Sequence, residues 1–455
     1  MNRVAGRAGA VLLLVLVLVG GLGFFVAEYI VNASQWVLFP GSPHVYYAGN
    51  IGSGVVVDRE NILLLNMTGR REYSSDTAIR KSTLHWIGDR NGSVSAPALP
   101  NYSQQIAGFD LLNGLYRYGE TTSVSTLTLS ARVQAVALEA MGNRKGTIAV
   151  YNYQTGELLC AVTTPTYDPN DIPDLSADTE GVYEGMYLNR FLQSAYTPGS
   201  IFKIVTLAAA LEEMPQVQEE SFSCTGTYPL SGGKVTCETA HGKQSLKQAF
   251  ANSCNCAFAQ LSEKMGGQTL ASYVEKFGVV APVSFDGITT ARGNFSAAST
   301  ASDVAWGAIG QYTDLVNPCA FLTFMGAVAG GGTGAVPHVV ASVSDSGSRT
   351  YTAKTQTHVP DLSVETALLL QEYLRFTVQN KYGDANFPGM TVCAKTGTGE
   401  LDNKASNAMF TGFVTDAQYP LAFIVCVEEG GYGRATCVPI ASKVLAACKE
   451  VLDAQ

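Results

Sequence analysis

The stretch Pro198-Gly199-Ser200-Ile201-Phe202-Lys203 places a serine and a lysine three residues apart, at the start of an apolar run. Thr197 and Pro198 are residue types that begin helices, so we expect a helix over residues 201–214 with Thr197 as its cap. Residues i and i+3 share one face of a helix, which puts the Lys203 amine over the Ser200 hydroxyl. The pair therefore has the form of a nucleophile with an adjacent base.

A second quartet, Ser231-Gly232-Gly233-Lys234, has the same spacing in a different setting. Each of its two central glycines disfavours a helix by about 1 kcal/mol. We interpret this quartet as a turn and assign the nucleophile to Ser200.

Two more short motifs follow in the order Ser253-Cys254-Asn255 and then Lys395-Thr396-Gly397-Thr398. The ordered set S-x-x-K, S-x-N and K-T-G is far more specific than any of its members. It predicts a serine acyl-transfer site in which a lysine, not a histidine, takes the proton.

Length and composition limit the other possibilities. The chain has 455 residues, enough for two or three domains, and 46% of them are apolar. The net charge of −9 argues against nucleic acid as a partner. The five histidines show no ligand spacing, so we expect neither a metal site nor a cofactor.

An apolar segment near the N-terminus predicts a membrane anchor. Residues 8–27 carry no charge and are long enough to cross a bilayer as a helix. Arg3 and Arg7 precede them, which by the positive-inside rule leaves the N-terminus in the cytoplasm and the rest outside. The alternative is a signal peptide cleaved after Val31-Asn32-Ala33. We favour a single-pass anchor in the cell membrane over residues 8–30, behind a cytoplasmic tail of residues 1–7.

The ten cysteines are many for an exported chain. Cys160 and Cys426 lie in apolar runs and are interpreted as core residues. Cys224 and Cys237 flank a glycine-rich turn, and a hairpin there would bring them together as a candidate disulfide. The pattern leaves open whether these two are bonded or are free thiols.

The remaining patterns predict an α+β fold. Residues 31–124 form a small β-rich module, and strands at both ends of residues 125–455 imply one antiparallel sheet with an inserted helical lobe. The expected helices are residues 127–141, 262–277, 301–329, 364–379 and 438–452, and the expected strands are residues 146–152, 157–163, 392–398, 409–414 and 421–427.

At these motifs the chain resembles the transpeptidase domain of class B (monofunctional) penicillin-binding proteins, over about residues 125–455. Segments such as Tyr167-Asp168-Pro169-Asn170, Gly310-Gln311 and Phe410-Thr411-Gly412-Phe413 add to the resemblance. Tyr312, Asn317 and Gly399 depart from the residues that are common in the family.

The resemblance implies D,D-transpeptidation, with Ser200 attacking the D-Ala–D-Ala bond of a cell-wall stem peptide. It places Lys395 against Ser200 and Lys203, and burial together with this second cation is expected to keep Lys203 neutral. Ser253 is expected to bridge the two lysines, and Asn255 to donate to a substrate carbonyl. Thr396, Gly397 and Thr398 are expected to bind the substrate from a strand that borders the cleft.

The resemblance also implies binding partners and leaves alternative functions open. β-Lactams are expected to acylate Ser200, and a polytopic membrane glycan polymerase is an expected partner. The rival functions are a D,D-carboxypeptidase or β-lactamase, a non-enzymatic β-lactam sensor, and a scaffold for the polymerase.

Overall fold

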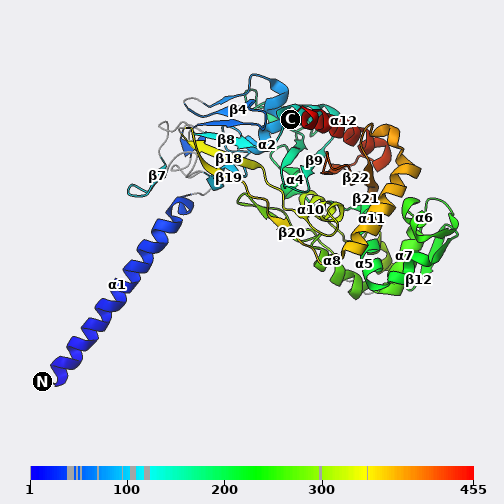
Figure 1. Cartoon of the computed structure of the whole chain (residues 1–455), viewed down its shortest axis with the longest axis horizontal. Helices are drawn as coiled ribbons and strands as arrows, with labels where there is room; N and C mark the ends of the chain where they lie inside the picture. The colour runs from blue at the N-terminus through cyan, green and yellow to red at the C-terminus, as the bar shows by residue number, and fades with distance from the viewer. Residues whose placement is uncertain are drawn as a thin grey trace.

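A computed structural model of the chain describes residues 2–37, 46–47, 50–51, 54–68, 71–94, 96–102, 109–116, 123–296, 300–345 and 347–454. Its first element is the long helix α1 (Asn2–Trp36), which projects away from the rest of the chain (Figure 1). Residues Gly6–Ala33 of this helix are apolar enough to span a membrane. The Tyr29 hydroxyl, near the end of the helix, donates to the carbonyl of Leu111 at 2.9 Å.

A five-stranded antiparallel sheet forms the centre of the larger body, in the order β10-β9-β23-β22-β21. Two strands from before Ser200 thus pair with three from the C-terminal part, which confirms the predicted sheet. The strands are β9 (Gly146–Asn152), β10 (Leu158–Thr164), β21 (Val392–Leu401), β22 (Lys404–Val414) and β23 (Leu421–Val427).

Helices cover both faces of this sheet, so its strands are apolar on both sides. On one face, Ile148 and Val150 share a core with Val444 of α12 (Gly433–Asp453), and α3 (Ala131–Met141) packs beside them. On the other face, Ala149 and Tyr151 belong to the core that contains α10 (Pro318–Ala329). The strand alternation therefore divides the residues between two buried layers.

The lobe inserted between the two sets of strands is mainly helical, as predicted, but two of the expected helices are divided. Residues 262–277 contain a break at Gly266, which has a φ of +82°. Residues 301–329 are interrupted at Gly310 and Tyr312, which also have positive φ, and the helix restarts at Pro318. The helices of the lobe are α5 (Lys203–Glu213), α6 (Leu246–Ala251), α7 (Asn255–Met265), α8 (Gly267–Phe277) and α9 (Ala301–Ala308).

The lobe also carries two small antiparallel strand pairs that the sequence analysis did not list as strands. They are β11 (Ser221–Cys224) with β14 (Gly242–Ser245), and β12 (Thr227–Leu230) with β13 (Gly233–Thr236). The quartet at Ser231 lies at the turn of the second pair, as predicted: Ser231 and Gly232 form the turn, and Gly233 and Lys234 begin β13. After the lobe, α11 (Val364–Thr377) leads through a π turn (Val378–Tyr382) toward β21.

A second sheet joins early and late segments of the chain in the order β19-β18-β8-β3-β4-β5. Its strands are β3 (Val55–Val57), β4 (Leu63–Asn66), β5 (Glu72–Tyr73), β8 (Val124–Leu127), β18 (Val340–Asp345) and β19 (Ser348–Thr352). Leu127 therefore ends a strand, and the helix expected from residue 127 begins at Ala131 after its cap Ser130. The early segment also contains a helix, α2 (Thr77–Ile87), which packs on α3.

Candidate active site

Ser200 lies on a 3-10 turn (Gly199–Ile201) that runs directly into α5. The helix begins at Lys203, two residues later than expected, and the structure gives Thr197 no capping hydrogen bond to this turn. Gly199 has a φ of +54°, and a Cβ added there would lie 2.2 Å from the Thr398 carbonyl oxygen. The turn is thus pressed against strand β21, and only glycine fits at this contact.

The Lys203 side chain lies beneath Ser200 and is fully buried. Its Nζ is 3.1 Å from Ser200 Oγ, 3.2 Å from Ser253 Oγ and 2.6 Å from Asn255 Oδ1. It also donates to the backbone carbonyl of Ser253 at 2.7 Å. The spacing of three residues thus brings the lysine to the serine across a 3-10 turn instead of along a regular helix.

Ser253 connects the two lysines. Its Oγ accepts from Lys395 Nζ at 3.0 Å and lies next to Lys203 on the other side. The residue has a φ of +55°, a conformation that costs a non-glycine residue energy and is found often at functional sites. Four residues from three separate motifs, Ser200, Lys203, Ser253 and Lys395, therefore form one connected group.

Burial changes the proton affinity of both lysines. It lowers the pKa of Lys203 to about 8, although nearby cysteines oppose this shift. Burial first, and then the charge of Lys203, lower the pKa of Lys395 well below its usual value. The expected effect of burial on Lys203 is present. The two amines resist being protonated together.

Strand β21 carries the third motif and lies at the edge of the five-stranded sheet. A Cβ added to Gly397 would lie 2.4 Å from the Pro198 carbonyl oxygen, so the glycine is needed for contact with the Ser200 turn. Gly397 therefore has a role inside the protein, in addition to the substrate contact expected from the sequence.

Tyr382 supports the same strand and was not anticipated from the sequence. Its buried hydroxyl lies 2.9 Å from Thr396 Oγ1 and accepts from the Thr396 backbone N–H at 2.9 Å. No motif marks it, because a tyrosine in a π turn between a helix and a strand has no distinctive sequence pattern.

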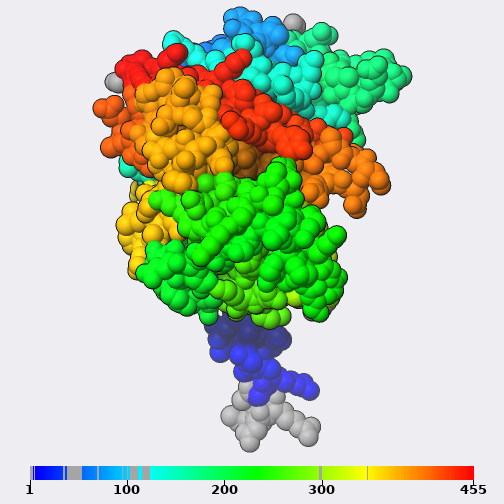
Figure 2. Space-filling model, turned by 90° about the vertical axis from the view of Figure 1, so that its right-hand side faces the viewer, coloured from blue at the N-terminus to red at the C-terminus, as the bar shows by residue number. Residues whose placement is uncertain are grey.

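A pocket of about 390 Å³ opens over Ser200. Its lining comes from the helical lobe (green in Figure 2) and from the C-terminal third (orange and red), which lie against each other on the face that Figure 2 shows. Ser253, Asn255, Thr396, Gly397 and Thr398 line the pocket. So do residues that the sequence analysis did not assign to a site: Thr236, Cys237, Glu238, Thr239, His241, Asn252, Trp306, Ile309, Glu400, Tyr432, Gly433 and Arg434.

Gln311 ties the lobe to the edge of β21. Its side-chain nitrogen donates to the Thr398 carbonyl at 3.0 Å, and its side-chain oxygen accepts from the Glu400 backbone N–H at 3.0 Å. Gln311, from the Gly310-Gln311 pair noted in the sequence, thus occupies the strand edge at the last residue of the third motif and just beyond it.

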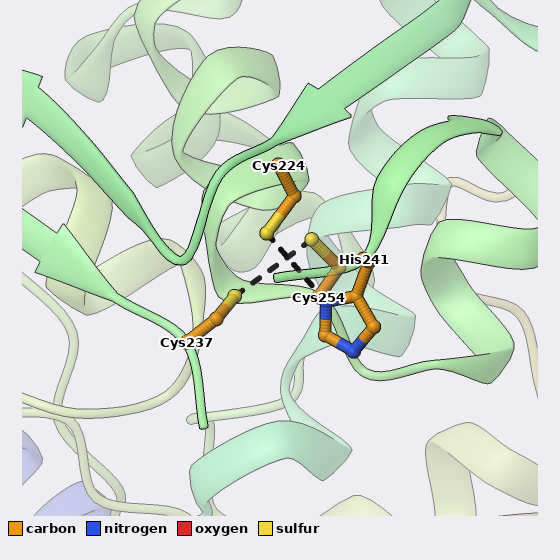
Figure 3. A group of neighbouring side chains, drawn as sticks. All are labelled: Cys224, Cys237, His241 and Cys254. Atoms are coloured by element: carbon orange, nitrogen blue, oxygen red, sulfur yellow. Dashed lines mark hydrogen bonds between the residues drawn. The ribbon is translucent and has the colours of Figure 1, made fainter. Parts of the chain in front are cut away.

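The cysteines near the pocket differ from the expectation. The predicted hairpin forms, but Cys224 and Cys237 are not bonded, and all ten cysteines are free thiols. Instead, Cys224, Cys237, His241 and Cys254 point toward one another, with their ligand atoms within 4.8 Å (Figure 3). The histidine spacing that predicted no metal site did not anticipate this group, because its members come from separate loops of the lobe.

Comparison with known families agrees with the geometry. The model of the penicillin binding protein transpeptidase domain matches residues 146–446. A curated relative, the peptidoglycan D,D-transpeptidase PbpA of Mycolicibacterium smegmatis, is 27% identical over 350 residues. The match covers 70% of this chain and 71% of that protein.

Solved structures have the same fold. The D,D-transpeptidase domain of a peptidoglycan glycosyltransferase from Eggerthella lenta superimposes with a TM-score of 0.74 at 26% identity, covering 89% of this chain and 99% of that one. A ceftriaxone acyl-enzyme complex of penicillin-binding protein A from Mycobacterium tuberculosis has a TM-score of 0.74 at 23% identity, covering 87% and 98%.

Proposed function

The chain belongs to the penicillin-binding protein transpeptidase family, and we propose that it cross-links peptidoglycan stem peptides through an acyl-enzyme on Ser200. In this reaction the Ser200 hydroxyl attacks the carbonyl carbon of the D-Ala–D-Ala bond. The terminal D-Ala leaves as an amine, and an amine of a neighbouring stem peptide then takes the acyl group from the serine. β-Lactams present a similar amide and acylate the same oxygen.

Lys203 is our candidate for the general base. A neutral amine 3.1 Å from Ser200 Oγ is within the distance for proton transfer. Ser253 Oγ, in contact with both lysine amines, can pass a proton on to the leaving amine. We assign Lys395 to this relay. Because the two amines resist being protonated together, Lys395 can carry the positive charge that attracts the substrate carboxylate while Lys203 is neutral.

The edge of β21 is our candidate for the substrate-binding strand. An extended peptide can pair with an edge strand through backbone groups that no neighbouring strand uses. The Thr396 N–H donates to Tyr382 and not to β22, so it points to the open edge of the sheet. Because backbone N–H groups alternate in direction along a strand, the Thr398 N–H, two residues further on, points to the same edge. We propose that the Thr398 and Ser200 N–H groups form the oxyanion hole. Thr396 and Thr398 would offer hydroxyls to the terminal carboxylate, and the amide of Asn255 would donate to a substrate carbonyl.

The observation that carries this proposal is the contact of the buried Lys203 amine with both Ser200 and Ser253. The test is covalent labelling of the full chain with a fluorescent penicillin. We expect Ser200→Ala to lose all labelling while its far-UV circular dichroism and melting temperature stay those of the wild type. Ser231→Ala is the matched control, since Ser231 has the same motif spacing in a hairpin turn. Labelling that survives in Ser200→Ala would refute the assignment.

The rate at which the label is lost separates the proposal from its enzymatic rivals. A transpeptidase that lacks its acceptor amine keeps a β-lactam acyl group for a long time, whereas a β-lactamase releases it rapidly to water. We expect slow loss from the wild-type chain. The cross-linked dimer formed from two synthetic stem peptides, measured by mass spectrometry, then separates a transpeptidase from a carboxypeptidase, a sensor and a scaffold.

We also propose a topology, supported by the apolar helix α1 and by Arg3 and Arg7 before it. Residues 1–7 are cytoplasmic, residues 8–30 cross the membrane, and the module of residues 31–124 and the transpeptidase domain of residues 125–455 lie outside. Protease added to intact spheroplasts should then degrade the large domain. A protected domain would contradict the orientation, and a soluble chain beginning near Ser34 would indicate cleavage.

A polytopic membrane glycan polymerase is the partner that we propose, on the basis of the class B resemblance and the membrane anchor. Photo-crosslinking from positions along residues 8–30 should capture such a polymerase in the membrane. Capture from the exposed surface of α12 serves as the control and should not occur.

A further inference from the structure

Four side chains beside the pocket have the spacing of a tetrahedral metal site. Cys237 Sγ lies 3.8 Å from Cys254 Sγ, and Cys224 Sγ lies 3.6 Å from His241 Nδ1 (Figure 3). Zinc bound at about 2.3 Å to sulfur and about 2.0 Å to nitrogen places two ligand atoms roughly 3.5 to 3.8 Å apart. These two separations match edges of such a tetrahedron, and all four ligand atoms lie within 4.8 Å of one another.

The four residues come from three different loops and converge on one point. Cys224 ends β11, Cys237 follows β13, and His241 precedes β14. Cys254 immediately precedes α7 and is the middle residue of the Ser253-Cys254-Asn255 motif. Cys224 and Cys254 are buried, while Cys237 and His241 are partly exposed toward the pocket. An ion can therefore reach the four side chains from the pocket, past Cys237 and His241.

The surroundings suit thiolate ligands. The backbone N–H of Cys256 points at Cys237 Sγ at 3.3 Å, and such a contact orients and stabilises a ligating sulfur. Three thiolates and an imidazole in a tetrahedral arrangement favour zinc over calcium, magnesium or manganese, which prefer oxygen ligands. Because four protein atoms fill the coordination sphere, the site is structural and leaves no position for a water nucleophile.

We infer that Cys224, Cys237, His241 and Cys254 bind one Zn²⁺, which fastens the hairpin loop of the lobe to the motif that carries Ser253 and Asn255. Asn255 already depends on this loop, because its Nδ2 donates to the Thr236 carbonyl at 2.7 Å while its Oδ1 accepts from Lys203. The metal would fix Thr236–Cys237 relative to Cys254–Asn255 and so hold Asn255 against the lysine. The metal site is independent of the proposed function, whereas this positioning role rests on it.

Metal content is the first test, made on the full chain purified in detergent under reducing conditions with Zn²⁺ present. We expect about one zinc per chain in the wild type and in Cys448→Ala, a buried cysteine of α12 on the opposite face of the central sheet. His241→Ala should lose most of the zinc, and His241→Cys should retain it, since four cysteines also form structural zinc sites. Co²⁺ in place of zinc should give the thiolate charge-transfer and d–d absorption of a tetrahedral site, and His241→Ala should change it.

Acylation by penicillin is the second test. We expect the rate constant to fall at least about 10-fold in His241→Ala and to recover in His241→Cys, with Cys448→Ala unchanged. A wild-type chain without zinc would overturn the metal site, as would a count of eight thiols instead of ten in a chain that is purified without reductant and then unfolded, which indicates a disulfide. Zinc loss without slower acylation would overturn the positioning role alone. A wild-type chain that binds zinc but is never acylated would refute the proposed function and leave the metal site standing.

Discussion

The two walls of the pocket are built in different ways. On one wall, β21 pairs with β22 over most of its length, and its lysine is fixed by a sheet whose inner strands are buried. On the other wall, Ser253 and Asn255 lie between α6 and the start of α7, and the loop that contacts Asn255 lies between strands of only four residues, several of which are exposed. The position of Lys395 is therefore set by the central sheet, whereas the Asn255 side chain also depends on its hydrogen bond to the Thr236 carbonyl at the start of this loop. Predictions that act on one wall at a time can test this difference.

The largest effect is expected where both walls meet, at Lys203. Lys203→Arg keeps a cation there, but arginine does not lose its proton in a protein. Acylation by a β-lactam should therefore fall by at least about 100-fold, the lower range for the loss of a positioned base. Stopped-flow measurement of the acylation rate constant checks this result. A rate like that of the wild type would mean that another group takes the Ser200 proton.

The change in the acylation rate constant of the wild type with pH should be nearly as large as the effect of Lys203→Arg. Burial lowers the pKa of Lys203 to about 8, and the base must be neutral, so acylation rises as pH increases through this value. Between pH 6 and pH 9 the neutral fraction, and with it the rate constant, should increase about 90-fold. A flat profile measured with a β-lactam whose own charge does not change in this range would contradict the role of Lys203.

Gly397→Ala tests the sheet wall. The added methyl group would lie 2.4 Å from the Pro198 carbonyl oxygen, so strand and turn must move apart. We expect a loss of about 1–3 kcal/mol in the free energy of unfolding and acylation slower by on the order of 10-fold. Gly266→Ala is the control on the lobe side, since its φ of +82° is unsuited to alanine but a methyl group there meets open space. It should destabilise the chain by about 1 kcal/mol and leave acylation unchanged.

Tyr382→Phe should have the smallest effect. The substitution removes a buried hydroxyl that contacts the Thr396 side chain and accepts from its backbone N–H. We expect a loss of about 1–3 kcal/mol in stability from the unpaired N–H and a reduction in acylation of only a few fold, because the ladder with β22 still holds the strand. A reduction as large as that of Gly397→Ala would mean that the sheet wall is less rigid than its pairing implies.

The same contrast explains what could be predicted from the sequence. The strands of the central sheet are long apolar runs, and their predicted positions agree with β9, β10, β21, β22 and β23. The ends of the helices in the lobe were harder to predict, because the apolar periodicity continues across Gly266 and Tyr312, where the backbone turns at positive φ. Leu127 was assigned to a helix because its apolar side chain fits either pattern, and pairing with Val340 places it in a strand.

Contacts between loops could not be predicted from the sequence, for a different reason. The group around His241 forms only when three loops of the lobe come together, and no spacing along the chain encodes that meeting. The motifs, in contrast, have a fixed order and local geometry. They could be found without knowing the fold, whereas Tyr382 and the cysteine group could not.

The strand order of the central sheet also determines when, during synthesis, the sheet can be completed. Strand β9 lies between β10 and β23, so one edge of the β9–β10 hairpin has no partner until synthesis has passed residue 427. At about 5–20 residues per second, the roughly 270 residues between β9 and β23 take on the order of 14–54 seconds to make. During this time an apolar hairpin with an open edge must be kept from pairing with other chains. Strand β23, within residues 421–455, therefore completes the central sheet by pairing with β9. A chain whose synthesis stops before β23 cannot close its core.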